Sequence, residues 1–421
     1  MVQPPVIVVP GITASNLEDF YPVPPESVWS AVLNKKHDRF ALHPDNLLYE
    51  AKEPARVRAV SIFELVYEDL MAALREELQR DDEVTPVFPF EYDWRQDCRL
   101  TADLLDKFSD EVIARTKLLP HYRGEDFRVD MVGHSMGGLI IAAYLNRYGN
   151  KEKVRRVVSI GTPFQGAVDA VLKLIIGKGQ LTGENPRDRE RVTARTVPAI
   201  YQLLPSFDGA VKGVGGAPTD LFDPKTWQHS ILKSLTRYIK QHKAQIKPEA
   251  LLRKYLATAE KHRRMVKTVD LNKSLPEKVD GWLAIVGVGS PTQVEIETSR
   301  LNDGSLRFNV LDDKDDWSKD KPESTATGDG TVPFKGALPE FMAKEKVICV
   351  CPDDFSRWEI RDRLLAKAAG FHGFLPAVNL VQRLVTRFLR EDYTGHVWAW
   401  KPPAVDKGRW SPPDWLEKKP K

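Results

Sequence analysis

Apolar runs alternate along the chain with segments in which apolar residues recur every three to four positions. The runs are typical of buried strands and the recurring positions of amphipathic helices. Strands are predicted at 5–10, 83–94, 154–166, 281–290 and 345–352, helices at 61–78 and 101–116, and a strand, sharp turn and helix at 127–149. This alternation favours an α/β fold with a mostly parallel sheet covered by helices on both faces.

The pattern changes between residues 166 and 281. This segment is rich in Lys, Arg and Gln, contains helical patterns and has few strand-like runs. We therefore expect an inserted helical cap or lid at 167–280, with the core formed by 1–166 and 281–395. The polar stretch 298–330 is expected to be an irregular excursion beyond the sheet edge. Residues 396–421 form a separate C-terminal tail rich in tryptophan and proline.

Composition and charge narrow the functional classes. The 421 residues are 42% hydrophobic and 29% charged, which is enough to build a core. A net charge of +3 is too mild to indicate a nucleic-acid partner. The three cysteines form neither a disulfide framework nor a metal-ligand spacing. No signal-peptide pattern and no apolar run of about 18 residues are found, so a cytoplasmic chain is expected, with signal-less export left open.

The sharpest motif is Gly133-His134-Ser135-Met136-Gly137, which matches G-x-S-x-G. In this nucleophile elbow, the serine occupies a strained turn between a strand and a helix, and the glycines relieve crowding. The predicted strand and helix on either side supply the required context. Ser135 is therefore predicted to be the nucleophile of an α/β-hydrolase fold. His134 points away from the hydroxyl in such a turn, so a structural role is expected for it.

The base and the acid are expected in the chain order Ser, Asp or Glu, His. His372, in the loop-like segment GFHGFLP after the last predicted strand, is the favoured base, with His396 in the tail as the alternative. Asp329 in TGDGTVP is the favoured acid, because flanking glycines allow a turn that aims the carboxylate at an imidazole. Asp353 and Asp354 are held in reserve.

An oxyanion hole needs two backbone N–H groups that face the reacting carbonyl. Met136, directly after the nucleophile, is expected to supply one of them. Ile12, in the loop that follows the first strand, is the candidate for the second, although a plain strand-ending turn explains this segment equally well.

Several segments taken together resemble the lecithin:cholesterol acyltransferase-like family of phospholipases and acyltransferases, which have the α/β-hydrolase fold. The matching segments are Val8–Ile12 followed by Ala14–Glu18, Phe90–Arg95 with its Y-D-W-R signature, Gly133–Gly138, Ser159–Gly166, Gly328–Pro333 and His372-Gly373. The resemblance implies that Ile12 and Met136 are the oxyanion donors. It also implies acyl-enzyme chemistry on lipid esters.

The expected reaction is hydrolysis of an ester, or transfer of its acyl group to an alcohol, through an acyl-enzyme on Ser135. This chemistry needs no metal or organic cofactor. The alternatives are an esterase or thioesterase acting on non-phospholipid or protein-linked acyl groups, and a catalytically silent interaction module. Peripheral membrane contact through Ala170–Gly177 and the tail tryptophans is a further possibility, with packing against the protein as its alternative.

Overall fold

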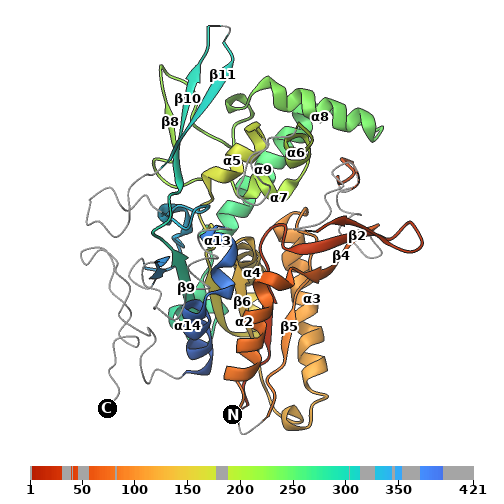
Figure 1. Cartoon of the computed structure of the whole chain (residues 1–421), viewed down its shortest axis with the longest axis vertical. Coiled ribbons are helices and arrows are strands. Elements are labelled where there is room, and N and C mark those ends of the chain that lie inside the picture. Colours follow the sequence, from red (N-terminus) through yellow and green to blue (C-terminus); the bar gives the residue numbers. More distant parts are fainter. Residues whose placement is uncertain are drawn as a thin grey trace.

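The structure is a computed structural model, and it describes most of the chain (Figure 1). The described residues are 2–30, 39, 41–45, 56–80, 83–176, 188–302, 304–312, 328–343, 347–352 and 370–391. The predicted tail at 396–421, with the alternative base His396, lies outside them. The reserve acids Asp353 and Asp354 also lie outside the described residues.

A six-stranded sheet forms the centre of the molecule, and each pair of neighbouring strands in it is parallel. The strand order is β12-β9-β7-β6-β1-β5. Its strands are β1 (Val6–Val9), β5 (Val87–Pro89), β6 (Val129–His134), β7 (Val154–Ile160), β9 (Trp282–Gly287) and β12 (Val347–Val350). Every residue of β1, β6, β9 and β12 is buried, which explains why these strands are continuous apolar runs.

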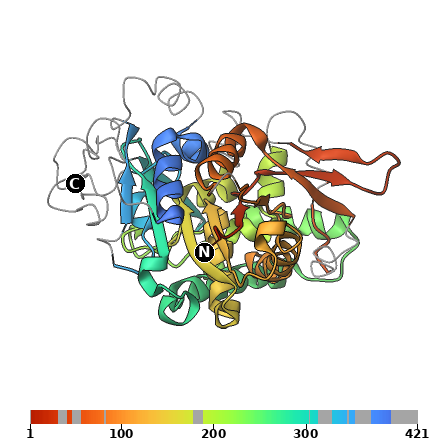
Figure 2. The ribbon, with the colours of Figure 1, turned by 90° about the horizontal axis from the view of Figure 1, so that it is seen from below.

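Helices cover both faces of this sheet, which confirms the predicted fold class. Helices α2 and α14 pack together on one face, and α3 and α4 pack together on the other (Figure 2). Their bounds are α2 (Glu64–Glu77), α3 (Cys98–Thr116), α4 (Met136–Tyr148) and α14 (Asn379–Arg390). Helix α2 buries Val66, Leu70 and Leu74. These residues recur every four positions, and this recurrence predicted the helix.

The described residues between β7 and β9 are mostly helical. Their helices lie beyond the carboxyl ends of the sheet strands, at the top of Figure 1. They are α5 (Val168–Ile176), α6 (Asp188–Ala194), α7 (Pro198–Gln202), α8 (His229–Gln241) and α9 (Pro248–Lys267). The short helices α10 (Leu271–Ser274), α11 (Phe334–Ala337) and α13 (Phe371–Phe374) belong to later connections. Among the described residues, no helix combines the length and the apolar character needed to cross a bilayer.

A buried arginine joins α9 to the segments that follow β7 and α7. Arg263 of α9 donates hydrogen bonds to the carbonyl of Phe164, just after β7, and to the carbonyls of Gln202 and Leu204 at 3.0 and 3.1 Å. Burial lowers the pKa of this guanidinium to about 10. Because a buried charge is tolerated only when polar groups surround it, these carbonyls fix α9 against the loop that follows β7.

Two three-stranded sheets flank the core, and the sequence pattern did not predict them. One has the order β3-β2-β4 and the other β11-β10-β8. The strands are β2 (Ser15–Asp19), β3 (Glu26–Trp29), β4 (Val57–Ile62), β8 (Val211–Gly213), β10 (Gln293–Arg300) and β11 (Leu306–Asp312). The expectation of an irregular stretch from residue 298 is therefore wrong up to residue 312. The strand is recognisable by its period of two, because Ile296 and Thr298 are buried and Glu297 between them is less buried.

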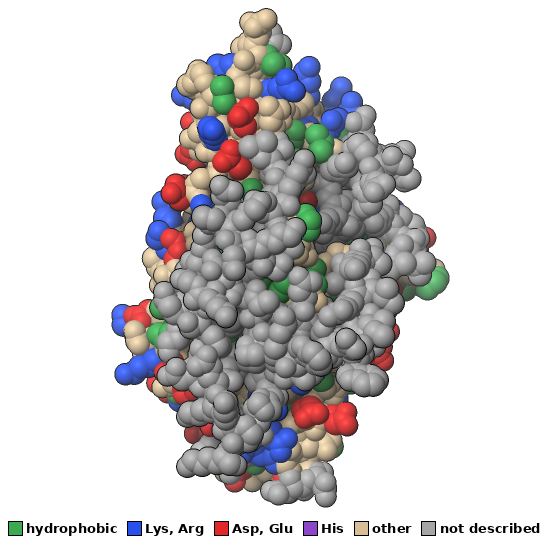
Figure 3. Space-filling view, turned by 60° about the vertical axis from the view of Figure 1, so that its left-hand side comes forward, with side chains coloured by type: hydrophobic (Ala, Val, Ile, Leu, Met, Phe, Trp, Pro, Cys, Tyr) green, Lys and Arg blue, Asp and Glu red, His purple; other side chains and the backbone are tan. Residues whose placement is uncertain are grey.

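In the view of Figure 3, Lys and Arg side chains are intermixed with Asp and Glu toward the top of the molecule, where the β10–β11 hairpin lies. This mixture agrees with the small net charge of the chain, +3.

Candidate active site

Ser135 occupies the turn between β6 and α4 in a strained backbone conformation. Its φ and ψ angles are 51° and −123°, in a region that side-chain-bearing residues rarely adopt. Its N–H donates to the carbonyl of Ile160 at 2.8 Å, which ties the turn to β7. A Cβ at Gly137 would lie 2.1 Å from the carbonyl oxygen of Val9, so only glycine lets the helix start this close to β1.

The structure brings Ser135, Asp329 and His372 together, although they are far apart in sequence. His372 Nε2 lies 2.9 Å from Ser135 Oγ, and His372 Nδ1 lies 2.7 Å from Asp329 Oδ2. All three residues are buried, with 6%, 1% and 4% of their surface exposed. This is the hydrogen-bond geometry of a nucleophile, a base and an orienting acid.

The carboxylate of Asp329 is fixed by its own turn. Oδ1 accepts hydrogen bonds from the backbone N–H groups of Thr331 at 3.0 Å and Val332 at 2.7 Å, which leaves Oδ2 directed at His372. The carbonyl of Asp329 also accepts from the N–H of His372 at 3.0 Å. Side chain and backbone therefore hold the imidazole in a single orientation.

Thr292 supports this turn, and sequence reasoning missed it. Its buried Oγ1 accepts hydrogen bonds from the N–H groups of Gly328 at 3.1 Å and Gly330 at 2.9 Å, on either side of Asp329. No local motif marks this threonine, because its partners lie more than 30 positions further along the chain.

Several backbone groups of the loop that follows β1 are hydrogen-bonded within the protein. Gly11 N–H donates to Tyr67 Oη at 2.9 Å, and the carbonyl of Gly11 accepts from Ala14 N–H at 3.3 Å. The carbonyl of Thr13 accepts from the indole of Trp29 at 3.0 Å. Within the described part of the chain, neither the N–H of Ile12 nor that of Met136 donates to an acceptor.

This loop lies against the nucleophile. A Cβ built at Gly11 would lie only 3.0 Å from Ser135 Cβ. Met136 is the first residue of α4, where backbone N–H groups have no intrahelical partner. The N–H groups of Ile12 and Met136 are therefore the candidate donors for an oxyanion hole beside Ser135.

The segment Tyr92–Arg95 supports the same loop from the end of β5. Tyr92 Oη donates to the carbonyl of Pro10 at 2.8 Å, and Trp94 Nε1 donates to the carbonyl of Ser15 at 3.3 Å. Arg95 pairs with Asp93 in a bidentate contact at 2.6 and 2.7 Å. None of these contacts reaches Ser135, so this segment supports the loop from outside the hydrogen-bond line of Ser135.

His134 also has the structural surroundings expected for it. Its Nδ1 lies 2.7 Å from Tyr67 Oη, and its Nε2 lies 3.0 Å from the carbonyl oxygen of His372. Burial lowers the pKa of His134 to about 3, so the ring is neutral at physiological pH. The role of Tyr67 could not be predicted from the sequence, because Tyr67 is one of several buried positions on α2.

The apolar run Ala170–Gly177, considered for membrane contact, is largely inside the protein. Ala170, Val171, Leu172, Leu174 and Ile175 are buried, and Ile176 is partly exposed. Gly177 lies outside the described residues. Packing against the protein, the alternative for this run, is therefore what the described part of α5 shows.

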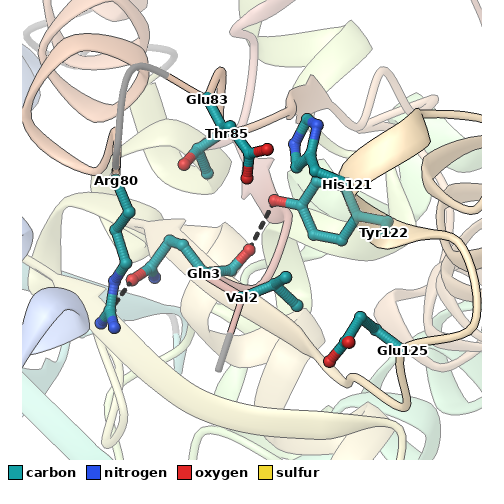
Figure 4. Close-up of a pocket in the computed structure, with 8 residues that line it drawn as sticks. All are labelled: Val2, Gln3, Arg80, Glu83, Thr85, His121, Tyr122 and Glu125. Atoms are coloured by element: carbon teal, nitrogen blue, oxygen red, sulfur yellow. Dashed lines mark hydrogen bonds between the residues drawn. The ribbon is translucent and has the colours of Figure 1, made fainter.

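A cavity of about 170 Å³ lies far from these residues, at the opposite end of the strands (Figure 4). It is lined by Gln3, Arg80 and Tyr122 among others, and Gln3 precedes β1. Within the described residues, no group of His, Cys, Asp or Glu is arranged to hold a metal ion. Ser135 and its partners thus form the candidate active site by geometry.

The parallel sheet, the strained serine turn and the flanking helices define an α/β hydrolase. The profile of the lecithin:cholesterol acyltransferase family matches residues 65–338, which is more than half of the chain. The chain therefore belongs to the lecithin:cholesterol acyltransferase family. Membership makes it an enzyme of the lipase and acyltransferase type, acting on lipid esters in general.

One solved structure with a TM-score above 0.5 supports the fold. The crystal structure of the Tle4–Tli4 complex matches with a TM-score of 0.63 and 14% identity, over 93% of this chain and 99% of that one. Lipase BlEst2 of Bacillus licheniformis has a TM-score of 0.29 and 13% identity, over 69% and 68% of the two chains. Phospholipase PlaB of Legionella pneumophila has a TM-score of 0.28 and 11% identity, over 74% and 51%. A search of curated proteins gave no match.

Proposed function

We propose that this protein hydrolyses lipid esters, or transfers their acyl groups to an alcohol, through an acyl-enzyme on Ser135. The observation that carries the proposal is the unbroken hydrogen-bond line from Ser135 Oγ to His372 and on to Asp329 Oδ2, at 2.9 and 2.7 Å. Family membership supports the substrate class, because it places the chain among lipid ester hydrolases and acyltransferases.

In the first step, His372 Nε2 takes the proton of Ser135 as Oγ attacks the ester carbonyl. The carbon–oxygen double bond opens, and the resulting oxyanion accepts hydrogen bonds from the N–H groups of Ile12 and Met136. Asp329 stabilises the imidazolium that forms. When the tetrahedral intermediate collapses, the ester bond breaks and the leaving alcohol takes the proton from His372.

In the second step, water or an acceptor alcohol gives its proton to His372 and attacks the acyl-enzyme. The acyl group leaves as a carboxylic acid or a new ester, and Ser135 regains its proton. Both outcomes use the same residues. Hydrolysis and transfer differ only in whether a second alcohol is held beside the acyl-enzyme in place of water.

The domain arrangement is part of the proposal. We assign residues 1–166 and 281–395 to the catalytic core, 167–280 to a cap over the carboxyl ends of the strands, and 396–421 to a separate tail. The β10–β11 hairpin pairs with β8 and so extends the cap side. Arg263 is the joint between cap and core, because its guanidinium binds carbonyls from both.

Contact with a lipid surface is also proposed, since the substrates of the family are lipids. The turn between β2 and β3 supports it, with Tyr21 and Val23 exposed by 74% and 96%. Replacing both residues with serine is expected to weaken co-sedimentation with phosphatidylcholine vesicles. Unchanged co-sedimentation would exclude this turn as the contact.

The experiment for the catalytic proposal is a lipid-ester panel with the wild type, Ser135→Ala and the control Ser109→Ala. Ser109 is also buried, but its hydroxyl donates to the carbonyl of Leu105 within α3. Ser135→Ala is expected to lose about 10⁴-fold or more in kcat, and Ser109→Ala to keep the wild-type kcat. Adding a long-chain alcohol then separates the two outcomes, because transfer yields a new ester. Retained ester cleavage by Ser135→Ala would refute the proposal.

A further inference from the structure

One peptide unit of the oxyanion loop is held from both sides by tyrosine hydroxyls. The Pro10–Gly11 peptide directs its carbonyl at Tyr92 Oη, 2.8 Å away, and its N–H at Tyr67 Oη, 2.9 Å away. Tyr67 and Tyr92 are 0% and 2% exposed, so both hydrogen bonds are shielded from bulk water. The next peptide along the chain carries the N–H of Ile12. Fixing one peptide plane therefore limits the rotation of the other.

The hydrogen-bond directions around Tyr67 follow from its partners. Tyr67 Oη accepts from Gly11 N–H, so its own proton is available to His134 Nδ1 at 2.7 Å. His134 then carries its proton on Nε2, and this N–H donates to the carbonyl of His372 at 3.0 Å. With the proton on Nδ1, the lone pair of Nε2 would face the lone pairs of that carbonyl oxygen, and the two would repel each other. Only the first arrangement satisfies each group.

These bonds form one continuous chain from Gly11 through Tyr67 and His134 to the backbone of His372. One end is the loop that presents the Ile12 amide, and the other is the residue proposed as the base. Of these residues, His372 is the one hydrogen-bonded to Ser135 Oγ. In a buried environment such a chain keeps its two ends at a fixed separation, because each bond is costly to break.

We propose that Tyr67 and Tyr92 are positioning residues, which hold the Ile12 amide at the oxyanion position and, through His134, fix the backbone of His372. This inference rests on the proposed function. It adds that the two tyrosine hydroxyls raise kcat, whereas a role in packing alone would require only the aromatic rings. Phenylalanine keeps the ring and removes the hydroxyl, so it separates the two roles.

The test compares Tyr67→Phe and Tyr92→Phe with the control Tyr122→Phe. Tyr122 is equally buried, and its hydroxyl donates to the carbonyl of Gln3 at 2.5 Å, at the opposite end of the strands (Figure 4). Melting temperature, kcat and KM are measured for a water-soluble short-chain ester. Each site variant is expected to lower kcat about 10- to 100-fold with KM within about threefold of wild type, because the oxyanion donor is displaced and not removed. Tyr122→Phe should keep the wild-type kcat.

A second pair of variants tests the link through His134. In His134→Gln the side-chain amide can still donate to the carbonyl of His372, whereas His134→Leu fills the space without a donor. We expect His134→Gln to turn over about tenfold faster than His134→Leu, at similar melting temperatures. Equal rates for the two variants would contradict the link.

The outcomes separate the inference from the proposed function. If the wild type cleaves esters and folded Tyr67→Phe and Tyr92→Phe keep its kcat, the inference is wrong and the proposed function stands. If the wild type cleaves no ester, the proposed function fails and the inference fails with it. If one tyrosine variant does not fold, the other variant and the His134 pair decide.

Discussion

Replacing Asp329 with asparagine should reverse the hydrogen-bond polarity of the whole site with little change in shape. In the wild type, Asp329 Oδ1 accepts from the N–H groups of Thr331 and Val332, and Oδ2 accepts from His372 Nδ1. An asparagine must keep its oxygen toward the two N–H groups, because its own amide would oppose them. Its NH₂ group is therefore forced to face His372.

The consequence for His372 is a change of tautomer. Its Nδ1 must accept from the new amide, so the ring proton moves to Nε2, which faces Ser135 Oγ at 2.9 Å. The imidazole then donates to the hydroxyl that it should deprotonate. Loss of the base in this way costs about 10⁴-fold in kcat, equivalent to about 5 kcal/mol in the barrier.

The assay is steady-state hydrolysis of a short-chain ester, with the folded fraction taken from thermal melting. Asp130→Asn is the control. Asp130 is also fully buried, but it lies near the start of β6, at the far end of the strand from Ser135, and it pairs with Arg155. Asp130→Asn should keep its kcat per folded molecule. If folded Asp329→Asn kept more than a tenth of the wild-type kcat, the tautomer argument would be refuted.

Three further predictions concern the backbone, the pH dependence of stability and the cap. Gly137→Ala places a Cβ 2.1 Å from the carbonyl of Val9, so its melting temperature should fall by about 10 °C or more, and an unchanged value would contradict the packing. Burial lowers the pKa of His262 to about 3, so over the range below pH 6.5 the unfolded chain binds a proton at this residue that the folded chain does not. The contribution of His262 should therefore lower the free energy of unfolding by about 1.4 kcal/mol per pH unit as the pH drops from 6.5 toward 5, in addition to the similar contribution of His134. In urea titrations His262→Leu should lose this part of the slope, and an identical slope would refute it. Arg263→Met removes the hydrogen bonds from α9 to the carbonyls of Phe164 and Gln202. Limited proteolysis should therefore cut the proposed cap faster than in the wild type, and an unchanged rate of cleavage would contradict this prediction.

Much of the fold could be predicted because the central sheet is buried on both sides. Strands such as Val6–Val9 and Trp282–Gly287 are apolar throughout, and this is visible in the sequence without any partner. The flanking sheets could not be predicted in the same way. Asp19, for example, is fully buried in β2 because Arg56 neutralises it, and nothing in the local sequence shows that pairing. In β10 the alternation of buried and less buried residues covers only Ile296 to Thr298, which is too short a pattern to predict a strand within a polar stretch.

The candidate site divides in a similar way. Ser135, Asp329 and His372 carry local motifs, and the structure places them within hydrogen-bond distance of one another. Their supports carry no such signal. Tyr67 and Thr292 act through hydroxyl groups whose partners lie more than 30 positions away, so only the folded chain identifies them.

Labelling with a fluorophosphonate, followed by mass mapping of the peptides, tests the central claim most directly. This reagent reacts with a serine that has an adjacent base and an oxyanion hole, so we expect one adduct per chain, on Ser135, and no adduct with Ser135→Ala. An unlabelled folded protein, or an adduct on a different serine, would contradict the account.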